Sequence, residues 1–387
     1  MIICEQQQCT GCAVCTTACK HRAISMQEGV NGHLFPVIDG EKCVECGACA
    51  KLCPNNNTIQ YHTPAAAYIA TVKNPLESKE STSSGIASAL ARQIIRTGGV
   101  VYGCCGRDIE HVRHIRVDNE NEVDLLKGSK YVQSSLIDIL PSIKEDLSKV
   151  KKVLFIGTPC QVAGVSRYLH NPDNLVTIDL VCHGVPSQRL LTDALHSYQP
   201  NCDLSSADVR FRKKDGGKSR YGLFVRDVNG IELYNSAFPA NEYITGFLSG
   251  LYYRESCYQC HYARPERVSD ITLGDYWDFE GRVKIANKEG GLSMLIVNSE
   301  KGVNLIKEGQ DLISLLSGDY SGFVKRNGQL SHPIKKNERY EGFKTDYPRL
   351  GFHKAAKKHL RMQILIIRKN MFINKIADLV HALRLNK

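Results

Sequence analysis

Two evenly spaced runs of cysteine near the N-terminus constrain this chain more than any other feature. The first run is Cys9-x-x-Cys12-x-x-Cys15-x-x-x-Cys19. The second repeats the spacing as Cys43-x-x-Cys46-x-x-Cys49-x-x-x-Cys53 and is followed by Pro54. Three thiolates at i, i+3 and i+6 in a tight loop wrap one iron–sulfur cube, but the loop cannot close round the cube with a fourth. Each run must therefore take its fourth ligand from elsewhere.

The spacing is that of bacterial two-cluster ferredoxins, in which the fourth cysteine of each run ligates the other cluster. It predicts two 4Fe–4S clusters. The ligands expected for the first are Cys9, Cys12, Cys15 and Cys53. Those expected for the second are Cys43, Cys46, Cys49 and Cys19. A disulfide framework and paired zinc sites are the alternatives, but zinc prefers two separated Cys-x-x-Cys pairs to a triple run.

Composition places these cysteines in a reducing compartment. The chain has 387 residues and sixteen cysteines, too long for a small disulfide-stabilised secreted domain. Its first residues, Met1-Ile-Ile-Cys4, have neither the basic nor the apolar region of a signal peptide. No apolar run approaches the roughly 18 residues that would span a bilayer. We therefore expect a cytoplasmic protein without a transmembrane segment.

The positive charge of the chain is concentrated at its end. The net charge is +10, and residues 354–387 contribute +8 of it, from nine Lys/Arg and one acid. The remaining residues are close to neutral, so the charge gives no indication of nucleic-acid binding.

Apolar segments separated by turn residues predict an α/β body after the cysteine runs. Residues 150–156 and 175–181 have the composition of buried strands, with a helix starting after Gly157. This order predicts a βαβ unit and a mainly parallel sheet. The expected fold is a dicluster ferredoxin module, a mixed α/β domain and a helical C-terminal segment. The expected bounds are 1–62 for the ferredoxin module, 63–84 for a linker, 85–300 for the α/β domain and 301–387 for a C-terminal extension.

Two polar turns precede expected helices. Residues 81–85 are Ser-Thr-Ser-Ser-Gly and open a helix that should end near Gly98. Such a turn presents backbone N–H groups and the positive end of the helix dipole, where a phosphate could sit. Simple N-capping by a serine is the alternative. The second turn, residues 127–135, is basic and contains a tyrosine, but any exposed turn could have this composition.

Four further cysteines lie in the α/β region. Cys160 and Cys182 follow the two predicted strands, at the carboxyl ends where ligands collect in parallel sheets. Cys160 is also near a helix N-terminus, which favours a thiolate. With Cys257 and Cys260 they provide enough thiols for a third 4Fe–4S cluster. A dithiol redox pair, half of a zinc site and inert buried cysteines remain open as alternatives.

The C-terminal segment predicts a basic amphipathic helix. Its apolar residues at helical spacing are Leu360, Ile364, Ile367 and Met371, then Phe372, Ile376, Leu379 and Leu383. The basic residues largely between them are Lys354, Lys357, Lys358, Arg361, Arg368, Lys369 and Lys375. Such a helix can lie on an anionic membrane surface or bind a partner. More commonly it packs on its own domain with one solvated face.

The order of these motifs resembles one known family. The ferredoxin module is followed by Ser-Ser-Gly-Ile, Lys-Gly-Ser-Lys-Tyr-Val-Gln-Ser, Gly-Thr-Pro-Cys-Gln, Cys-His-Gly, Cys-x-x-Cys and Ile-Thr-Leu-Gly-Asp-Tyr-Trp. Over roughly residues 1–300 the chain resembles the coenzyme F420 hydrogenase/dehydrogenase beta-subunit family.

The resemblance implies an iron–sulfur flavoprotein. Members bind FAD beside iron–sulfur clusters, and some use the deazaflavin coenzyme F420. The third-cluster cysteines match the family's cysteine positions. The residues that the resemblance implies for flavin binding are Ser84, Gly85, Lys127, Ser129, Lys130, Tyr131 and Gln133. The chain departs from the family pattern at Ile86, where a second glycine is common.

The expected function is an oxidoreductase that passes electrons between ferredoxin-type carriers and a two-electron organic substrate or deazaflavin coenzyme. The resemblance also implies a role in polysaccharide biosynthesis for some members. The expected partners are an electron-carrier protein or redox subunit and a small molecule. One alternative is a non-catalytic electron-transfer subunit, and another is a regulatory cluster protein that senses oxygen. No catalytic residue is assigned. His183 and Asp275 could exchange protons, but a structural role is commoner for each.

Overall fold

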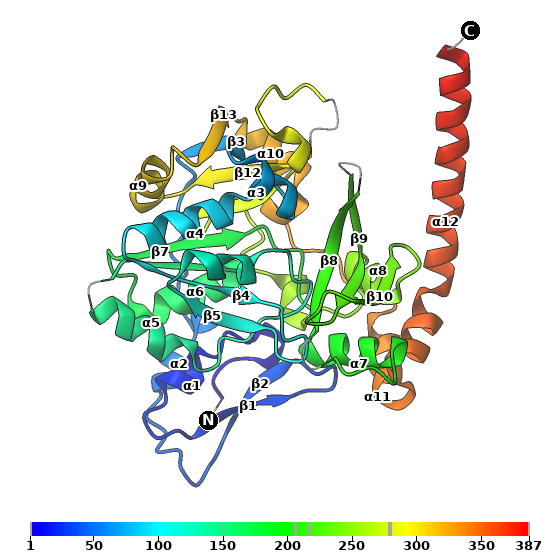
Figure 1. Cartoon of the computed structure of the whole chain (residues 1–387). Coiled ribbons are helices and arrows are strands. Elements are labelled where there is room, and N and C mark those ends of the chain that lie inside the picture. The colour runs from blue at the N-terminus through cyan, green and yellow to red at the C-terminus, as the bar shows by residue number, and fades with distance from the viewer. Residues whose placement is uncertain (1, 150, 205–206, 216–217, 278–280, 386–387) are drawn as a thin grey trace.

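A computed structural model describes residues 2–149, 151–204, 207–215, 218–277 and 281–385. The N-terminal module, at the bottom of Figure 1, contains an antiparallel hairpin and two one-turn helices. The hairpin strands are β1 (Ile24–Glu28) and β2 (Leu34–Ile38), and the helices are α1 (Val14–Ala18) and α2 (Ala48–Leu52). Each helix follows one cysteine loop, so the hairpin separates the two runs.

The body is built on an eight-stranded mixed sheet with the order β13-β3-β12-β11-β7-β6-β4-β5. Its strands are β3 (Ala66–Val72), β4 (Val100–Cys105), β5 (Arg113–Val117), β6 (Val153–Gly157), β7 (Leu175–Leu180), β11 (Ile271–Tyr276), β12 (Leu292–Val297) and β13 (Ile313–Ser317). The four central strands, β4, β6, β7 and β11, are parallel, and the others pair antiparallel. The predicted mixed α/β fold is confirmed.

Helices cover both faces of this sheet because its strands alternate in side-chain direction. Leu154 packs in the core under α4 (Ile86–Arg96) and α9 (Glu300–Glu308). Its neighbours in β6, Val153 and Phe155, pack in the opposite core, under α5 (Ile139–Ser148) and α6 (Pro159–Leu169). The second core also receives Val14 of α1, which is fully buried. The ferredoxin module thus packs on the α5–α6 face of the body.

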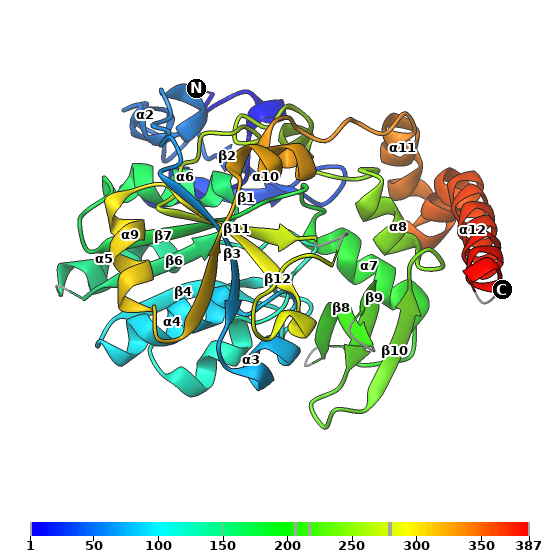
Figure 2. The same ribbon diagram turned by 90° about the horizontal axis from the view of Figure 1, so that it is seen from above.

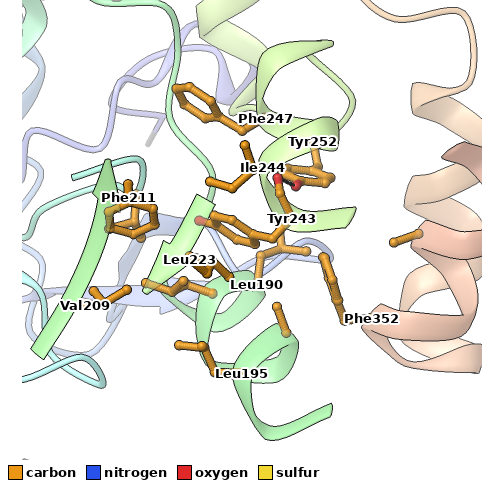
Figure 3. Packing of buried hydrophobic residues seen from close by; sticks show 14 of the residues in the cluster. Leu190, Leu195, Val209, Phe211, Leu223, Tyr243, Ile244, Phe247, Tyr252 and Phe352 are labelled. Carbon is orange, nitrogen blue, oxygen red and sulfur yellow. Dashed lines mark hydrogen bonds between the residues drawn. The ribbon is translucent and has the colours of Figure 1, made fainter. Parts of the chain in front are cut away.

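A third core joins a small sheet to the C-terminal helices. The sheet has the order β10-β9-β8, from β8 (Asp208–Asp215), β9 (Lys218–Arg226) and β10 (Glu232–Ala237). Its apolar residues pack with α7 (Gln188–Tyr198), α8 (Glu242–Leu248) and the start of α12 (Phe352–Leu385), as Figure 3 shows. Figure 2 shows this sheet and α12 beside the large sheet. The remaining helices are α3 (Pro75–Glu80), α10 (Tyr320–Arg326) and α11 (Tyr340–Leu350).

The sheet differs from the predicted domain division at two places. Residues 66–72, inside the expected linker, form β3, which pairs with β12 and β13. Residues 313–317, inside the expected C-terminal extension, form β13 at the sheet edge. β3 pairs with β12 and β13, which lie more than 200 residues away in sequence. The composition of residues 66–72 and 313–317 does not indicate pairing over such a distance.

Candidate metal centres

Cysteines of both runs line one cavity in the N-terminal module. Cys9, Cys12 and Cys15 come from the first run, and Cys53 ends the second. Cys4, which the sequence analysis did not single out, lines the same cavity. None of the sixteen cysteines forms a disulfide. The four run cysteines surround one space, as the ligands of a cubane cluster must.

A second cavity is lined by Cys43, Cys46 and Cys49 together with Cys19. The last cysteine of each run therefore lines the cavity of the other run. This grouping is the one expected from the spacing, and it suits two 4Fe–4S clusters. Ligation itself stays a prediction. The two cavities are neighbours, because Cys15, Cys49 and Cys53 pack in one small core.

Glycines shape both cysteine loops. Gly11 has φ +70° and Gly47 has φ +72°, in the left-handed region that favours glycine. Gly11 is constrained a second time, since a Cβ there would lie 2.6 Å from the Nη2 atom of Arg254. The first cysteine loop is thus in close contact with a residue 243 positions further along the chain.

The structure brings the four later cysteines together beside the first cavity. Cys160 lies in the first turn of α6, Cys182 follows β7, and Cys257 and Cys260 lie in and just after the short helix Glu255–Gln259. Burial raises the pKa of Cys182 well above its ordinary value, and the nearby Cys257, Cys160 and Cys260 raise it further. Cys182 therefore lies within electrostatic range of the other three thiols, and we call these four cysteines the third group.

Burial dominates the electrostatics of this third group. It raises the pKa of Cys257 to about 12 and that of Cys260 to about 11. It also raises the pKa of Cys160, although the Thr158 hydroxyl lies 3.3 Å from the Cys160 sulfur and acts in the opposite direction. The helix N-terminus was expected to favour the Cys160 thiolate, but burial has the larger effect and raises the pKa of this thiol. Since iron binds the thiolate form, loading this group must release protons.

Cys12 connects the first cavity to the third group. Cys12, Cys160 and Cys260 pack against the same core. A Cβ on Gly164 of α6 would lie 3.0 Å from the Cys12 Cβ, so the helix that carries Cys160 lies directly on Cys12. The three cysteine groups thus follow one another in the order second cavity, first cavity, third group.

Tyr262 provides a test of whether this third group suits a cluster. Its hydroxyl is buried and makes no hydrogen bond. The Tyr262 side chain lies close enough to Cys160, Cys12 and Cys260 to interact with them electrostatically. A buried donor without an acceptor is costly, and the sulfide of a bound cluster is an acceptor. The four thiols and this unpaired donor therefore have the chemistry that a 4Fe–4S cluster would need, and the cluster itself stays a prediction.

Arg254 lies between the first cavity and the third group and was missed by the sequence analysis. It is 1% exposed. Its Nη1 donates to the Cys9 carbonyl (3.1 Å), its Nη2 to the Leu34 carbonyl (2.7 Å) and its Nε to Gln133 Oε1 (3.0 Å). The guanidinium also lies 4.7 Å from the centre of the Phe35 ring. In the sequence, only its position three residues before Cys257 indicated that Arg254 lies near the cysteines.

The Arg254 guanidinium interacts electrostatically with cysteine sulfurs of two groups. Burial lowers the pKa of its guanidinium, and the groups that oppose this shift are Cys9, Cys257, Cys160 and Cys12. These thiols belong to both the first cavity and the third group. Arg254 is therefore placed to offset negative charge at two centres.

Four of the seven residues expected to bind a flavin gather where α4 begins. Gly85 is the N-cap of α4, with φ +87° and no side-chain cap. Ser84 Oγ donates to Ser293 Oγ at 2.7 Å, and the Ser129 N–H donates to Thr82 Oγ1 at 3.1 Å. Lys127 forms ion pairs with Asp124 (2.9 Å) and Glu77 (3.1 Å).

The other three expected flavin residues face different partners. Lys130 Nζ donates to the carbonyls of Leu126 and Lys127, each at 2.8 Å. The Tyr131 ring stacks on Phe247 at 4.3 Å. Gln133 Nε2 donates to the Thr10 carbonyl (3.0 Å) in the first cysteine loop. The seven residues therefore do not converge on one ligand. Two features at the N-terminus of α4 suit a phosphate. No side chain caps the helix there, and the buried hydroxyl of Ser81 makes no hydrogen bond.

The two candidate proton donors both have structural partners. Asp275 accepts a hydrogen bond from Arg212 Nη1 at 2.7 Å. His183 Nδ1 is 2.7 Å from the Tyr253 hydroxyl, and burial lowers the pKa of its imidazole. Trp277 is half-buried, and the Arg212 guanidinium lies 5.7 Å from its ring centre.

Comparison with known proteins identifies two parts of the chain. Residues 150–317 match the family described as the C terminus of the coenzyme F420 hydrogenase/dehydrogenase beta subunit. Residues 8–57 match the 4Fe-4S dicluster domain. One similar solved structure is the xenon-derivatised F420-reducing NiFe hydrogenase complex from Methanosarcina barkeri. The match has 16% identity over 66% of this chain and 83% of that chain, with a TM-score of 0.46. The comparison with curated proteins gave no match. Residues 150–317 therefore form a domain of the coenzyme F420 hydrogenase/dehydrogenase beta-subunit family, and residues 8–57 form a 4Fe-4S dicluster domain.

Proposed function

We propose that this chain is an iron–sulfur oxidoreductase that passes electrons between a one-electron carrier protein and a two-electron organic partner. The observation that carries the proposal is the series of three four-cysteine groups. The first two share the core around Cys15, Cys49 and Cys53, and the first and third share the core around Cys12 and Cys160. Such a series leads from the exposed N-terminal module, where Cys46 is exposed, into the α/β body.

The proposed ligand sets follow the three groups. They are Cys9, Cys12, Cys15 and Cys53 for the first cluster, Cys43, Cys46, Cys49 and Cys19 for the second, and Cys160, Cys182, Cys257 and Cys260 for the third. Clusters of this type carry single electrons at potentials that depend on net charge, hydrogen bonds to sulfur and exposure. In this chain the Arg254 guanidinium would supply positive charge beside the bound clusters, and the Tyr262 hydroxyl would supply a hydrogen-bond donor.

Replacing Cys257 by serine should remove the third cluster and leave the two N-terminal clusters intact. Cys257 lines neither N-terminal cavity. The iron content should fall by about four per chain, and the electron paramagnetic resonance signals of the two N-terminal clusters should persist. Loss of all iron on this one change would instead indicate general misfolding.

The organic partner is proposed from the family alone. It is a two-electron substrate or a deazaflavin coenzyme, reached through an FAD near the start of α4, in a cytoplasmic protein that serves polysaccharide biosynthesis. The uncapped α4 and the unpartnered Ser81 hydroxyl support one phosphate there. When bound, a flavin would exchange electron pairs with the organic partner and single electrons with the clusters. Acid release of about one flavin per purified chain would support this site.

Turnover assays separate this function from its runner-up. The oxidoreductase should oxidise or reduce an organic two-electron partner, such as a deazaflavin, with only a ferredoxin or viologen as the other reactant. An electron-transfer subunit would show this activity only after co-purification with a second protein. A cluster protein that only senses oxygen would bind no flavin and show no turnover in either assay. Clusters that cannot be reduced by dithionite or a ferredoxin would contradict the proposed function altogether.

A further inference from the structure

Helix α12 leaves the body of the protein after its first turns. Phe352, Ala355, Ala356 and Leu360 are buried and dock its start into the third core. Figure 3 shows Phe352 packed beside Tyr243 and Tyr252. Beyond this point the helix projects away from the other elements, as Figure 1 shows in red. The sequence favours a C-terminal helix that packs on the body of the protein. Only the beginning of α12 does so.

The projecting part carries exposed apolar side chains. Met362 is 54% exposed, Leu365 49%, Ile366 55%, Phe372 66% and Ile373 49%. Their spacing of three, four and seven residues places them on one side of the helix, whereas Met371, which is 42% exposed, lies on the other side. We call these five residues the α12 stripe. Ile376, Leu379 and Leu383, expected to continue the apolar pattern, have side chains outside the described part.

The same stretch is strongly basic. Residues 352–374 contain six Lys/Arg and no acid. They are Lys354, Lys357, Lys358, Arg361, Arg368 and Lys369, and all six are exposed. Of these, Lys358 pairs with Asp346 at 2.6 Å. Arg361 and Arg368, seven residues apart, flank the stripe, and Lys369 lies within it. Long basic side chains beside apolar ones can bury their stems while their charges reach an anionic surface.

We infer that α12 lies on an anionic lipid bilayer, with the α12 stripe in the interface and the basic residues on the headgroups. A second copy of the chain is disfavoured as the occupant, because it would bring two acid-free basic helices together. An anionic bilayer satisfies both the apolar and the basic residues. Among the described residues, no helix is long and apolar enough to cross a membrane. The contact is therefore peripheral, and it does not depend on the proposed redox function.

Vesicle flotation with the anaerobically purified full chain tests this inference. We expect the chain to float with phosphatidylcholine vesicles that contain about one third phosphatidylglycerol, and at least tenfold less with phosphatidylcholine alone. About 0.5 M salt should release it, since salt screens the basic residues. The Leu365→Ser/Phe372→Ser variant should lose at least tenfold of the binding.

The matched control is Val228→Ser/Ile231→Ser, which removes two apolar side chains that are 75% and 61% exposed in the β9–β10 connection. It should bind as the unchanged chain does. Iron content and circular dichroism of both variants check folding. Equal binding to neutral vesicles, or binding unaffected by Leu365→Ser/Phe372→Ser, would overturn the inference. So would a chain that ignores vesicles and instead dimerises, or binds only an acidic protein, through the stripe.

Discussion

Replacing Cys19 by alanine should remove the second cluster, although Cys19 belongs to the first cysteine run. The physical reason is that Cys19 lines the cavity of Cys43, Cys46 and Cys49. This cavity suits the test better than the first one, where Cys4 is an additional thiol that could replace a lost ligand. About four irons per chain should be lost.

Two double variants identify the lost cluster by iron content alone. Cys19→Ala with Cys43→Ala should lose no more iron than Cys19→Ala, because both changes affect one cluster. Cys19→Ala with Cys9→Ala, made in a Cys4→Ala chain so that Cys4 cannot replace Cys9, should lose about eight irons, because two clusters are affected. The opposite result, with Cys19 and Cys9 acting as one unit, would contradict the exchange of ligands between the two runs.

Replacing Arg254 by methionine should lower the reduction potentials of the first and third clusters. Removing a positive charge disfavours the reduced, more negative state of a nearby cluster. A unit charge about 8 Å from a redox centre at an effective dielectric constant of about 20 contributes roughly 2 kcal/mol, or on the order of 90 mV. Redox titration followed by electron paramagnetic resonance measures both potentials.

The second cluster is an internal control for this variant, because the thiols that interact with Arg254 do not line its cavity. These thiols are Cys9, Cys12, Cys160 and Cys257. Arg254→Lys is the matched variant. It cannot reproduce all three hydrogen bonds of the guanidinium, but it keeps the positive charge. The reduction potentials of the first and third clusters should therefore stay close to those of the unchanged chain. Unchanged potentials in Arg254→Met, with iron content retained, would contradict a role for Arg254 at both centres.

Much of what could be predicted from this sequence depends on the spacing of residues that are close together in the chain. The spacing within each cysteine run makes a loop that is too short to surround a cube with four ligands. It therefore predicts that Cys53 lines the cavity of the first run and that Cys19 lines the cavity of the second. The βαβ unit of β6, α6 and β7 is confirmed, because its apolar strands and its Pro-started helix are local signals. The mixed α/β class is also confirmed, and the family resemblance is confirmed over residues 150–317.

Contacts between distant residues account for what could not be predicted. Residues 66–72 were assigned to a linker, but they pair with β12 and β13. Arg254 reaches the Cys9 carbonyl across 245 positions, and Gln133 reaches the Thr10 carbonyl across 123. Gln133, which the resemblance implies for flavin binding, lies against the first cysteine loop, and its role at a flavin stays a prediction. Tertiary packing alone decides such partners.

The iron content of the anaerobically reconstituted full chain tests the central claim most directly. Three 4Fe–4S clusters predict about twelve irons and about as many sulfides per chain. The third cluster is the part of the account that depends on the grouping of Cys160, Cys182, Cys257 and Cys260. A stable preparation with about eight irons, all sixteen cysteines intact and no further uptake would contradict the continuation of the series beyond the N-terminal module.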